Sequence, residues 1–199
     1  MAEEYGGVKF RSVVKDAPPP YDKRLNELRQ WCKVFHERNL TPPYPGGSYG
    51  NLSFRIKPGD NSFIITGTSI GLKDALDDSS FVKVTSCDLE KKIVYAEGKR
   101  CPSSESMLHY SIYNARPYVQ AVFHGHAKEF LTNAVNLNCP ETATVEPYGS
   151  IELVNSVLAI LGYQNFFIIK NHGFVSLGNS MKETGERCLE LLNGYYNAI

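Results

Sequence analysis

The chain has 199 residues, enough for one domain with an apolar core that needs no disulfide bonds. Its 21 Lys and Arg balance its 21 Asp and Glu, so no long-range field attracts nucleic acid or an acidic membrane, and an anionic substrate would need a local positive site. The five cysteines include no C-x-x-C pair, and the sequence shows neither a signal peptide nor an apolar run of membrane-spanning length. We therefore expect a cytoplasmic protein with free thiols.

The first element is an extended N-terminal arm over residues 1–20, because this segment ends in three prolines, Pro18–Pro20. Residues 21–199 are predicted to form one domain. It opens with an amphipathic helix within 21–40, where apolar residues recur at helical spacing: Leu25, Leu28, Trp31, Cys32 and Phe35. The Gly-rich segment 45–50 is expected to lack regular structure and to let the backbone approach a neighbouring group closely.

Strands and helices interleave in the rest of the chain. Strand-like runs lie at 52–56, 63–66, 81–85, 93–95, 119–124, 165–170 and 174–177. Helices are predicted at about 104–115, from about 127, at about 151–161 and at about 180–196. This order predicts an α/β layered domain around one mixed sheet.

The most specific motif is His124-Gly125-His126 at the end of an apolar strand. Residues i and i+2 of a strand project from one face, so both imidazoles can bind one metal ion. His172, at the end of another strand, is a third candidate ligand. The alternative is that His124 and His126 are surface histidines at a strand end and that His172 is a turn residue, without a metal ion.

A second motif, Pro102-Ser103-Ser104-Glu105, precedes a predicted helix. Ser103 or Ser104 can cap that helix, whose first turn then offers free N–H groups to a phosphate. Glu105 can be a general base beside a metal-bound carbonyl, or it can only complement the helix dipole.

Two further loops carry amide and hydroxyl donors, residues 50–53 with Asn51, and residues 66–69 with Thr68 and Ser69. Together with the serines they could surround a phosphate with neutral donors, although such clusters are usually turns. His109 is expected to pack or to support Glu105 from the same helical face, and His36 to face solvent.

In this order the motifs resemble the class II aldolase and adducin-head family, from about Leu25 to the end of the chain. The resemblance implies a largely antiparallel central sheet flanked by helices. It also implies one divalent ion per chain, usually Zn²⁺, bound by His124, His126 and His172, with Glu105 as the acid/base. The phosphate pocket of a small phosphorylated sugar would be formed by Asn51, Thr68, Ser103 and Ser104, with the backbone near Ser69. Members are typically homotetramers with active sites between subunits.

The chain departs from the family pattern at three places. Ser69 stands where the aldolases have glycine, the stretch between His126 and Pro147 is shorter, and the chain ends at Ile199 without a tail that supplies a tyrosine to the substrate. These differences leave the metal and phosphate sites intact and remove the basis for assigning the aldehyde.

The reaction implied by the resemblance is reversible cleavage of a ketose 1-phosphate, similar to fuculose 1-phosphate, into dihydroxyacetone phosphate and an aldehyde through a metal-stabilised enediolate. Glu105 would move the proton on carbon, which requires a raised pKa that burial favours and the metal charge opposes. The alternatives are a sugar-phosphate dehydratase or 4-epimerase of the same family and a non-catalytic adducin-like assembly domain.

Overall fold

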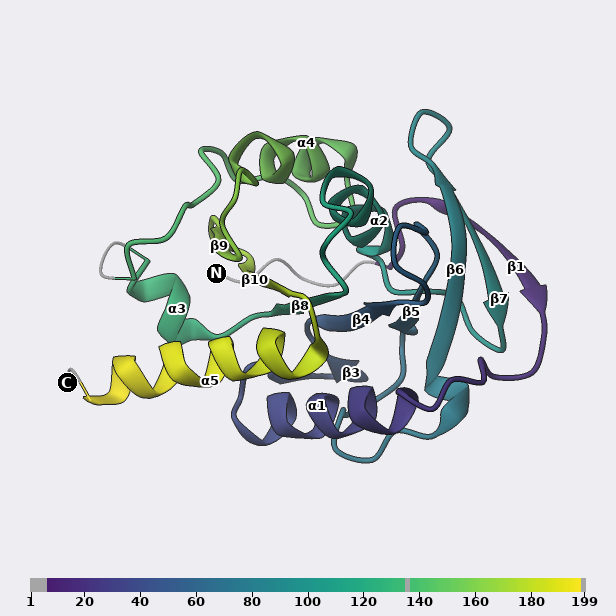
Figure 1. Ribbon diagram of the computed structural model, residues 1–199, viewed down its shortest axis with the longest axis horizontal. Coiled ribbons are helices and arrows are strands. Elements are labelled where there is room, and N and C mark those ends of the chain that lie inside the picture. The colour runs from purple at the N-terminus through teal and green to yellow at the C-terminus, as the bar shows by residue number, and fades with distance from the viewer. Residues whose placement is uncertain (1–6, 135–136, 198–199) are drawn as a thin grey trace.

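The computed structural model describes residues 7–134 and 137–197 (Figure 1). Residues 1–6 of the predicted arm and the final residue, Ile199, lie outside the described residues. The strands are β1 (Arg11–Asp16), β2 (Pro43–Tyr44), β3 (Gly47–Ser48), β4 (Asn51–Arg55), β5 (Phe63–Thr66), β6 (Phe81–Asp88), β7 (Ile93–Gly98), β8 (Ala121–Gly125), β9 (Phe166–Ile169) and β10 (Gly173–Gly178). The helices are α1 (Leu25–Glu37), the 3-10 helix η1 (Asp78–Ser80), α2 (Ser106–Ala115), α3 (Lys128–Thr132), α4 (Ile151–Ile160) and α5 (Met181–Asn197).

Eight strands form the central sheet, in the order β1-β7-β6-β5-β4-β8-β10-β9. Their neighbouring pairs are antiparallel, except that β1 runs parallel to β7. The prediction of a mixed, largely antiparallel sheet is therefore confirmed.

Helices cover both faces of this sheet (Figure 1). Helices α1, α3 and α5 pack with Phe54, Phe123 and Phe174 in one buried apolar cluster. Helices α2 and α4 pack with Phe63, Val122 and Val175 in a second cluster on the other face. Successive residues such as Val122 and Phe123 thus enter opposite layers, as the alternation along a strand requires. The layered α/β prediction is confirmed.

The N-terminal third of the structure differs from the sequence prediction at β1 and at the segment 45–50. Strand β1 was not predicted, because an isolated edge strand with the pattern RSVVKD carries little apolar alternation. The boundary of the arm at residue 20 stays a prediction. The segment 45–50 was expected to lack regular structure, and this was wrong, because Gly47–Ser48 pairs with Pro43–Tyr44 across a tight turn that contains Gly46 at φ 94°. The expected close approach does occur at Gly50, where an added Cβ would lie 2.5 Å from the His124 carbonyl oxygen.

Two histidines lie outside the candidate site. His109 is fully buried, its Nδ1 lies 2.7 Å from the hydroxyl oxygen of Ser53, and its ring stacks on Phe63. Burial lowers the pKa of His109 to about 3, so the ring is neutral and packs, as predicted. The prediction that His36 faces solvent was wrong. It is half-buried and its Nδ1 is shielded from water, because the last turn of α1 lies against the body.

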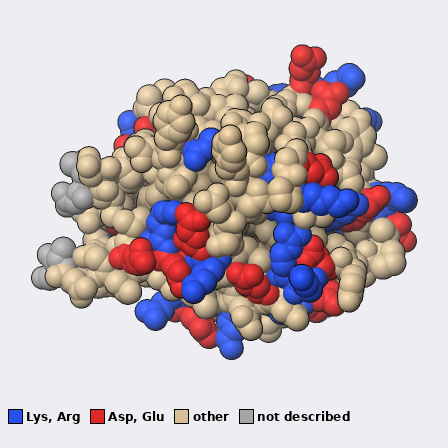
Figure 2. Space-filling model, in the orientation of Figure 1, with Lys and Arg blue, Asp and Glu red and all other residues tan. Residues whose placement is uncertain are grey.

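Charged side chains of both signs intermingle on the face of the molecule shown in Figure 2, without an extended patch of one sign on that face. This distribution agrees with the zero formal net charge of the sequence. No described helix is both long and apolar enough to span a membrane.

A methyl group at Gly125 is expected to destabilise the fold by about 1–3 kcal/mol, the usual cost of overpacking. In Gly125→Ala the new Cβ would lie 2.4 Å from the Leu40 carbonyl oxygen and 2.6 Å from the Phe174 ring. Denaturant unfolding measures the change. The matched control is Gly194→Ala in α5, where nothing lies within 4 Å and helix propensity should raise the stability by about 1 kcal/mol. Equal stabilities of wild type and Gly125→Ala would contradict this packing.

Candidate functional site

Three adjacent strands bring the candidate metal ligands to one end of the sheet. His124, near the end of β8, pairs with Asn51 at the start of β4 and with Val175 of β10. His126 follows β8, and His172 immediately precedes β10. Because β8 is antiparallel to both neighbours, its end meets their beginnings. The three histidines predicted from separate motifs therefore lie together.

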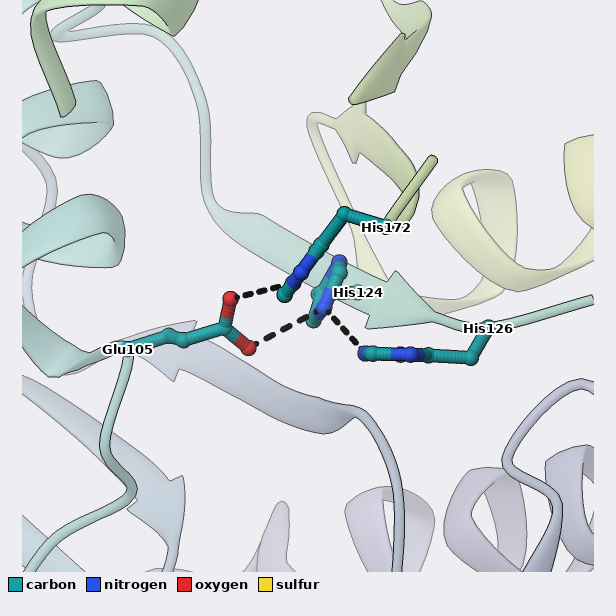
Figure 3. Close-up of side chains that lie close together, drawn as sticks. All are labelled: Glu105, His124, His126 and His172. Carbon is teal, nitrogen blue, oxygen red and sulfur yellow. Dashed lines mark hydrogen bonds and ion pairs between the residues drawn. The ribbon is translucent and has the colours of Figure 1, made fainter. Parts of the chain in front are cut away.

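Glu105 completes a four-residue cluster with these histidines (Figure 3). One ligand atom from each residue lies within 4.8 Å of the other three. The Nε2 atom of His124 lies 2.9 Å from Nε2 of His126 and 3.0 Å from Oε2 of Glu105. The other carboxylate oxygen, Oε1, lies 2.9 Å from Nε2 of His172. This geometry makes the cluster a candidate metal site.

The donor chemistry of the cluster fits a divalent cation. Nδ1 of His124 lies 2.8 Å from the carbonyl oxygen of Phe174, which can only accept, so that nitrogen carries the proton. Its Nε2 then presents a lone pair towards a carboxylate and a second imidazole. A carbonyl that fixes the tautomer and orientation of a ligating histidine is the usual arrangement behind metal sites. Burial, followed by the charges of neighbouring imidazoles, holds the pKa of His126 well below its usual range, which keeps it in the neutral form that binds metal.

Glu105 lies at the N-terminus of α2, is 3 % exposed, and forms no side-chain cap. Burial would raise the pKa of its carboxyl, but the imidazoles of His124 and His172 outweigh burial and hold that pKa well below its usual range. The charges of these imidazoles thus oppose the raised pKa that an acid/base role of Glu105 requires. The carboxylate faces the histidines rather than the helix backbone.

The predicted serine cap of α2 is also absent. The Ser103 hydroxyl lies at 3.5 Å from the Glu105 N–H, a long contact. Instead, the Ser103 carbonyl oxygen accepts from the backbone N–H of Ser106 at 3.0 Å and from its hydroxyl at 2.7 Å. The helix thus starts two residues later than expected, and the Ser103 and Ser104 hydroxyls are not used as caps.

Asn51 connects the sheet to Glu105. Its Nδ2 donates to Oε2 of Glu105 at 2.8 Å. Its Oδ1 is buried and forms no hydrogen bond. The amide therefore orients the carboxylate and leaves one acceptor that a bound molecule could satisfy.

The loop with Thr68 and Ser69 lies beside the serine loop. The backbone N–H of Thr68 donates to the carbonyl oxygen of Cys101 at 3.0 Å, and Gly67 bridges to Pro102. Ser69 has φ 54°, in the left-handed region that favours glycine. The backbone conformation expected of a glycine is thus present at Ser69.

One cavity connects these groups. It encloses about 690 Å³, open solvent at its mouth included. His124 is fully buried and does not line the cavity. The predicted site residues that line it are Asn51, Thr68, Ser69, Ser103, Ser104, Glu105, His126 and His172.

Sequence reasoning missed other residues of the cavity. Lys73 and Ser48 line it, and the ring of Tyr49 stacks on His126 with centroids 4.9 Å apart. Ser48 and Tyr49 lie in the segment recognised for close backbone approach, which was the available signal. Lys73 gave none, because a lysine beside an aspartate in a loop normally faces solvent.

Known proteins share this sequence pattern. The family model described as Class II Aldolase and Adducin N-terminal domain matches residues 26–194. An L-fuculose phosphate aldolase of Methanococcus maripaludis strain S2 is 31% identical over 174 residues, covering 80% of this chain and 87% of that protein. A protein of the same name from Methanocaldococcus jannaschii is 30% identical over 166 residues, covering 75% and 81%.

Solved structures share the fold. An L-fuculose 1-phosphate aldolase superimposes with a TM-score of 0.71 at 21% identity, covering 89% of this chain and 85% of that chain. A sugar-phosphate aldolase from Thermotoga maritima gives 0.69 at 17% identity, covering 88% and 93%. Together with the family match over most of the sequence, these likenesses lead to one conclusion: the chain belongs to the class II aldolase and adducin N-terminal domain family.

Proposed function

We propose that this protein is a metal-dependent aldolase that reversibly cleaves a ketose 1-phosphate, similar to fuculose 1-phosphate, into dihydroxyacetone phosphate and an aldehyde. The observation that carries the proposal is the position of Glu105, whose carboxylate contacts His124 and His172 inside a cavity that the Ser103 and Ser104 loop also lines. A carboxylate, a candidate metal-binding cluster and hydroxyl groups thus lie around one pocket. The relatives named above support an aldolase.

Three histidines, His124, His126 and His172, would hold one divalent ion, most simply Zn²⁺, whose ordinary ligands include imidazole nitrogens. A divalent ion bound there supplies a Lewis acid that stabilises negative charge developing on a substrate oxygen.

Glu105 would remove and return the proton on the substrate carbon. Its carboxylate is oriented by the Asn51 amide, which donates to Oε2. Such fixation reduces the reorganisation needed for proton transfer. Substrate binding would displace the carboxylate from at least one imidazole, which frees an oxygen for the proton.

The phosphate group would bind where the residue 66–69 and 102–104 loops meet. Hydroxyls and backbone N–H groups of Thr68, Ser69, Ser103 and Ser104, with the amide of Asn51, are the proposed donors. The α2 N-terminus adds the positive end of its dipole, since α2 has no side-chain cap.

Ser104→Ala is expected to weaken the binding of dihydroxyacetone phosphate about ten- to a hundredfold, because a lost donor to a buried anion costs about 1–3 kcal/mol. Ser104 is 9% exposed and lines the cavity. Isothermal calorimetry on metal-loaded protein measures the affinity. The control is Ser156→Ala on α4, whose hydroxyl donates to the Leu153 carbonyl oxygen away from the cavity. Unchanged affinity in Ser104→Ala would show that the phosphate group binds elsewhere.

The proposal includes a cytoplasmic homotetramer with active sites between subunits. The free state of all five cysteines supports a reducing compartment.

A cleavage screen tests the proposed function. Metal-loaded protein is incubated with a panel of ketose 1-phosphates, and released dihydroxyacetone phosphate is measured. Release from at least one member is the expected result. A product formed without cleavage of a carbon–carbon bond would instead indicate the epimerase or dehydratase reaction, and an inert protein would indicate an assembly domain.

A further inference from the structure

Lys73 is a buried lysine in the wall of the cavity. It lies in the loop between β5 and η1 and is 2% exposed. Its Nζ donates to the carbonyl oxygen of Ser48 at 3.2 Å, to the Ser48 hydroxyl oxygen at 2.9 Å and to the carbonyl oxygen of Tyr49 at 3.0 Å. The ammonium group thus uses its three donors on the β3 strand and the residue after it.

These acceptors are all neutral, and within the described part of the chain Lys73 forms no ion pair with a carboxylate. Burial lowers the pKa of Lys73 to about 8, so at pH 7 the protonated form still predominates. A buried ammonium that touches no carboxylate is costly and therefore rare in protein interiors. The charge of Glu105 favours the protonated form of Lys73 without contacting it, and a bound anion would add to this effect.

The charges around the cavity indicate which anion fits. Among the described residues that line it, Lys73 is the one Lys or Arg, and Glu105 is the one Asp or Glu. Their charges cancel, so a divalent ion in the histidine cluster leaves the cavity with two positive charges. A phosphoryl dianion neutralises both, whereas an uncharged sugar leaves them unbalanced.

We propose that Lys73 supplies the positive charge of the phosphate pocket and acts on the phosphoryl dianion through Ser48. The Ser48 hydroxyl accepts from Lys73 and donates to the Gly71 carbonyl oxygen at 3.1 Å. Rotation of that hydroxyl towards the cavity would direct a polarised O–H at the anion. Lys73 is therefore a positioning residue, and this role rests on the proposed phosphorylated substrate.

A purely structural role of Lys73 would have a different effect on ligand binding. Lys73 holds the Tyr49 backbone, and the Tyr49 ring stacks on His126. Loss of that support would disturb the candidate metal site and would affect charged and uncharged ligands alike. A role in charge recognition affects the phosphorylated ligand selectively.

Phosphate titration separates these roles. Inorganic phosphate is titrated by calorimetry into metal-loaded wild type, Lys73→Met, Lys73→Arg and the surface control Lys83→Met, whose lysine pairs with Glu97. Lys73→Met is expected to bind phosphate about 10–100-fold more weakly with its metal content unchanged, as expected for the loss of a charged partner. Lys73→Arg should recover most of the affinity, and Lys83→Met should match wild type. Wild-type phosphate affinity in Lys73→Met would overturn the inference.

Proton exchange provides a second readout. Deuterium incorporation from solvent is followed into dihydroxyacetone phosphate and into unphosphorylated dihydroxyacetone. Lys73→Met should raise KM for the phosphorylated ketone and leave the exchange rate of the unphosphorylated ketone unchanged. Equal losses for both ketones, with Lys73→Arg as impaired as Lys73→Met, would assign Lys73 a structural role. A wild type that exchanges neither ketone would refute the proposed function, while the phosphate titration still decides the role of Lys73.

Discussion

His126→Ala is expected to abolish tight metal binding and, with it, turnover of the sugar phosphate. The Nε2 atom of His126 lies 2.9 Å from that of His124, in the cluster that Glu105 and His172 complete. Removal of one imidazole leaves two, and catalytic zinc sites ordinarily use three protein ligands. Metal analysis after dialysis should find about one divalent ion per wild-type chain and none in the variant.

The matched control is His36→Ala, which removes a half-buried imidazole of α1 outside the cluster. That variant should keep its metal and its activity. Full metal occupancy in His126→Ala would remove this histidine from the site. A wild type without metal under metal-replete conditions would remove the site altogether.

Periodic features of the sequence were predictable because their cause is local. The buried residues of α1, Leu25, Leu28, Cys32 and Phe35, recur at the helical spacing read from the sequence. His124 and His126 were placed on one side from strand geometry, and their Nε2 atoms do meet. The layered fold could be predicted because helices cover both faces of the sheet, so its strands need apolar residues on both faces.

Other features depend on distant partners and could not be read locally. Strand β1 exists because its edge pairs with β7, about 80 residues away in the chain, as the register Arg11 to Ile93 shows. The predicted serine cap is absent because α2 begins only after Glu105, whose side chain contacts His124 and His172 on other elements. Lys73 was missed because its burial is imposed by the β2–β3 hairpin that folds over it.

Ser69 illustrates how a sequence difference can leave the backbone unchanged. Glycine is absent at this position, where the family resemblance places the phosphate beside the backbone. The structure nevertheless gives Ser69 φ 54°, a conformation that costs a residue with a Cβ about 1 kcal/mol or more. The rest of the loop, held through Gly67 and Thr68 to residues 101–102, imposes this conformation.

Glu105→Gln is expected to lower turnover by at least about a hundredfold while metal content stays the same, because an amide cannot accept the proton from carbon. The side chain keeps its size, so it still contacts Asn51 and His172, with an amide in place of the carboxylate. Steady-state cleavage and metal analysis measure the two quantities.

A carboxylate that only complements a helix dipole would behave differently, since its loss costs about 0.3–1 kcal/mol of stability and leaves turnover intact. Glu152 offers the matched control, because it is exposed in the first turn of α4. Glu152→Gln should keep full activity.

Solvent exchange on dihydroxyacetone phosphate alone isolates the role of Glu105, because this half-reaction needs the metal and the base but no aldehyde. Wild type should incorporate deuterium stereospecifically, and Glu105→Gln should stop the incorporation. A dehydratase for another substrate has no need to recognise this ketone, and an assembly domain would not exchange it. Exchange that continues undiminished in Glu105→Gln would show that another group moves the proton, in spite of the position of Glu105 among the three histidines.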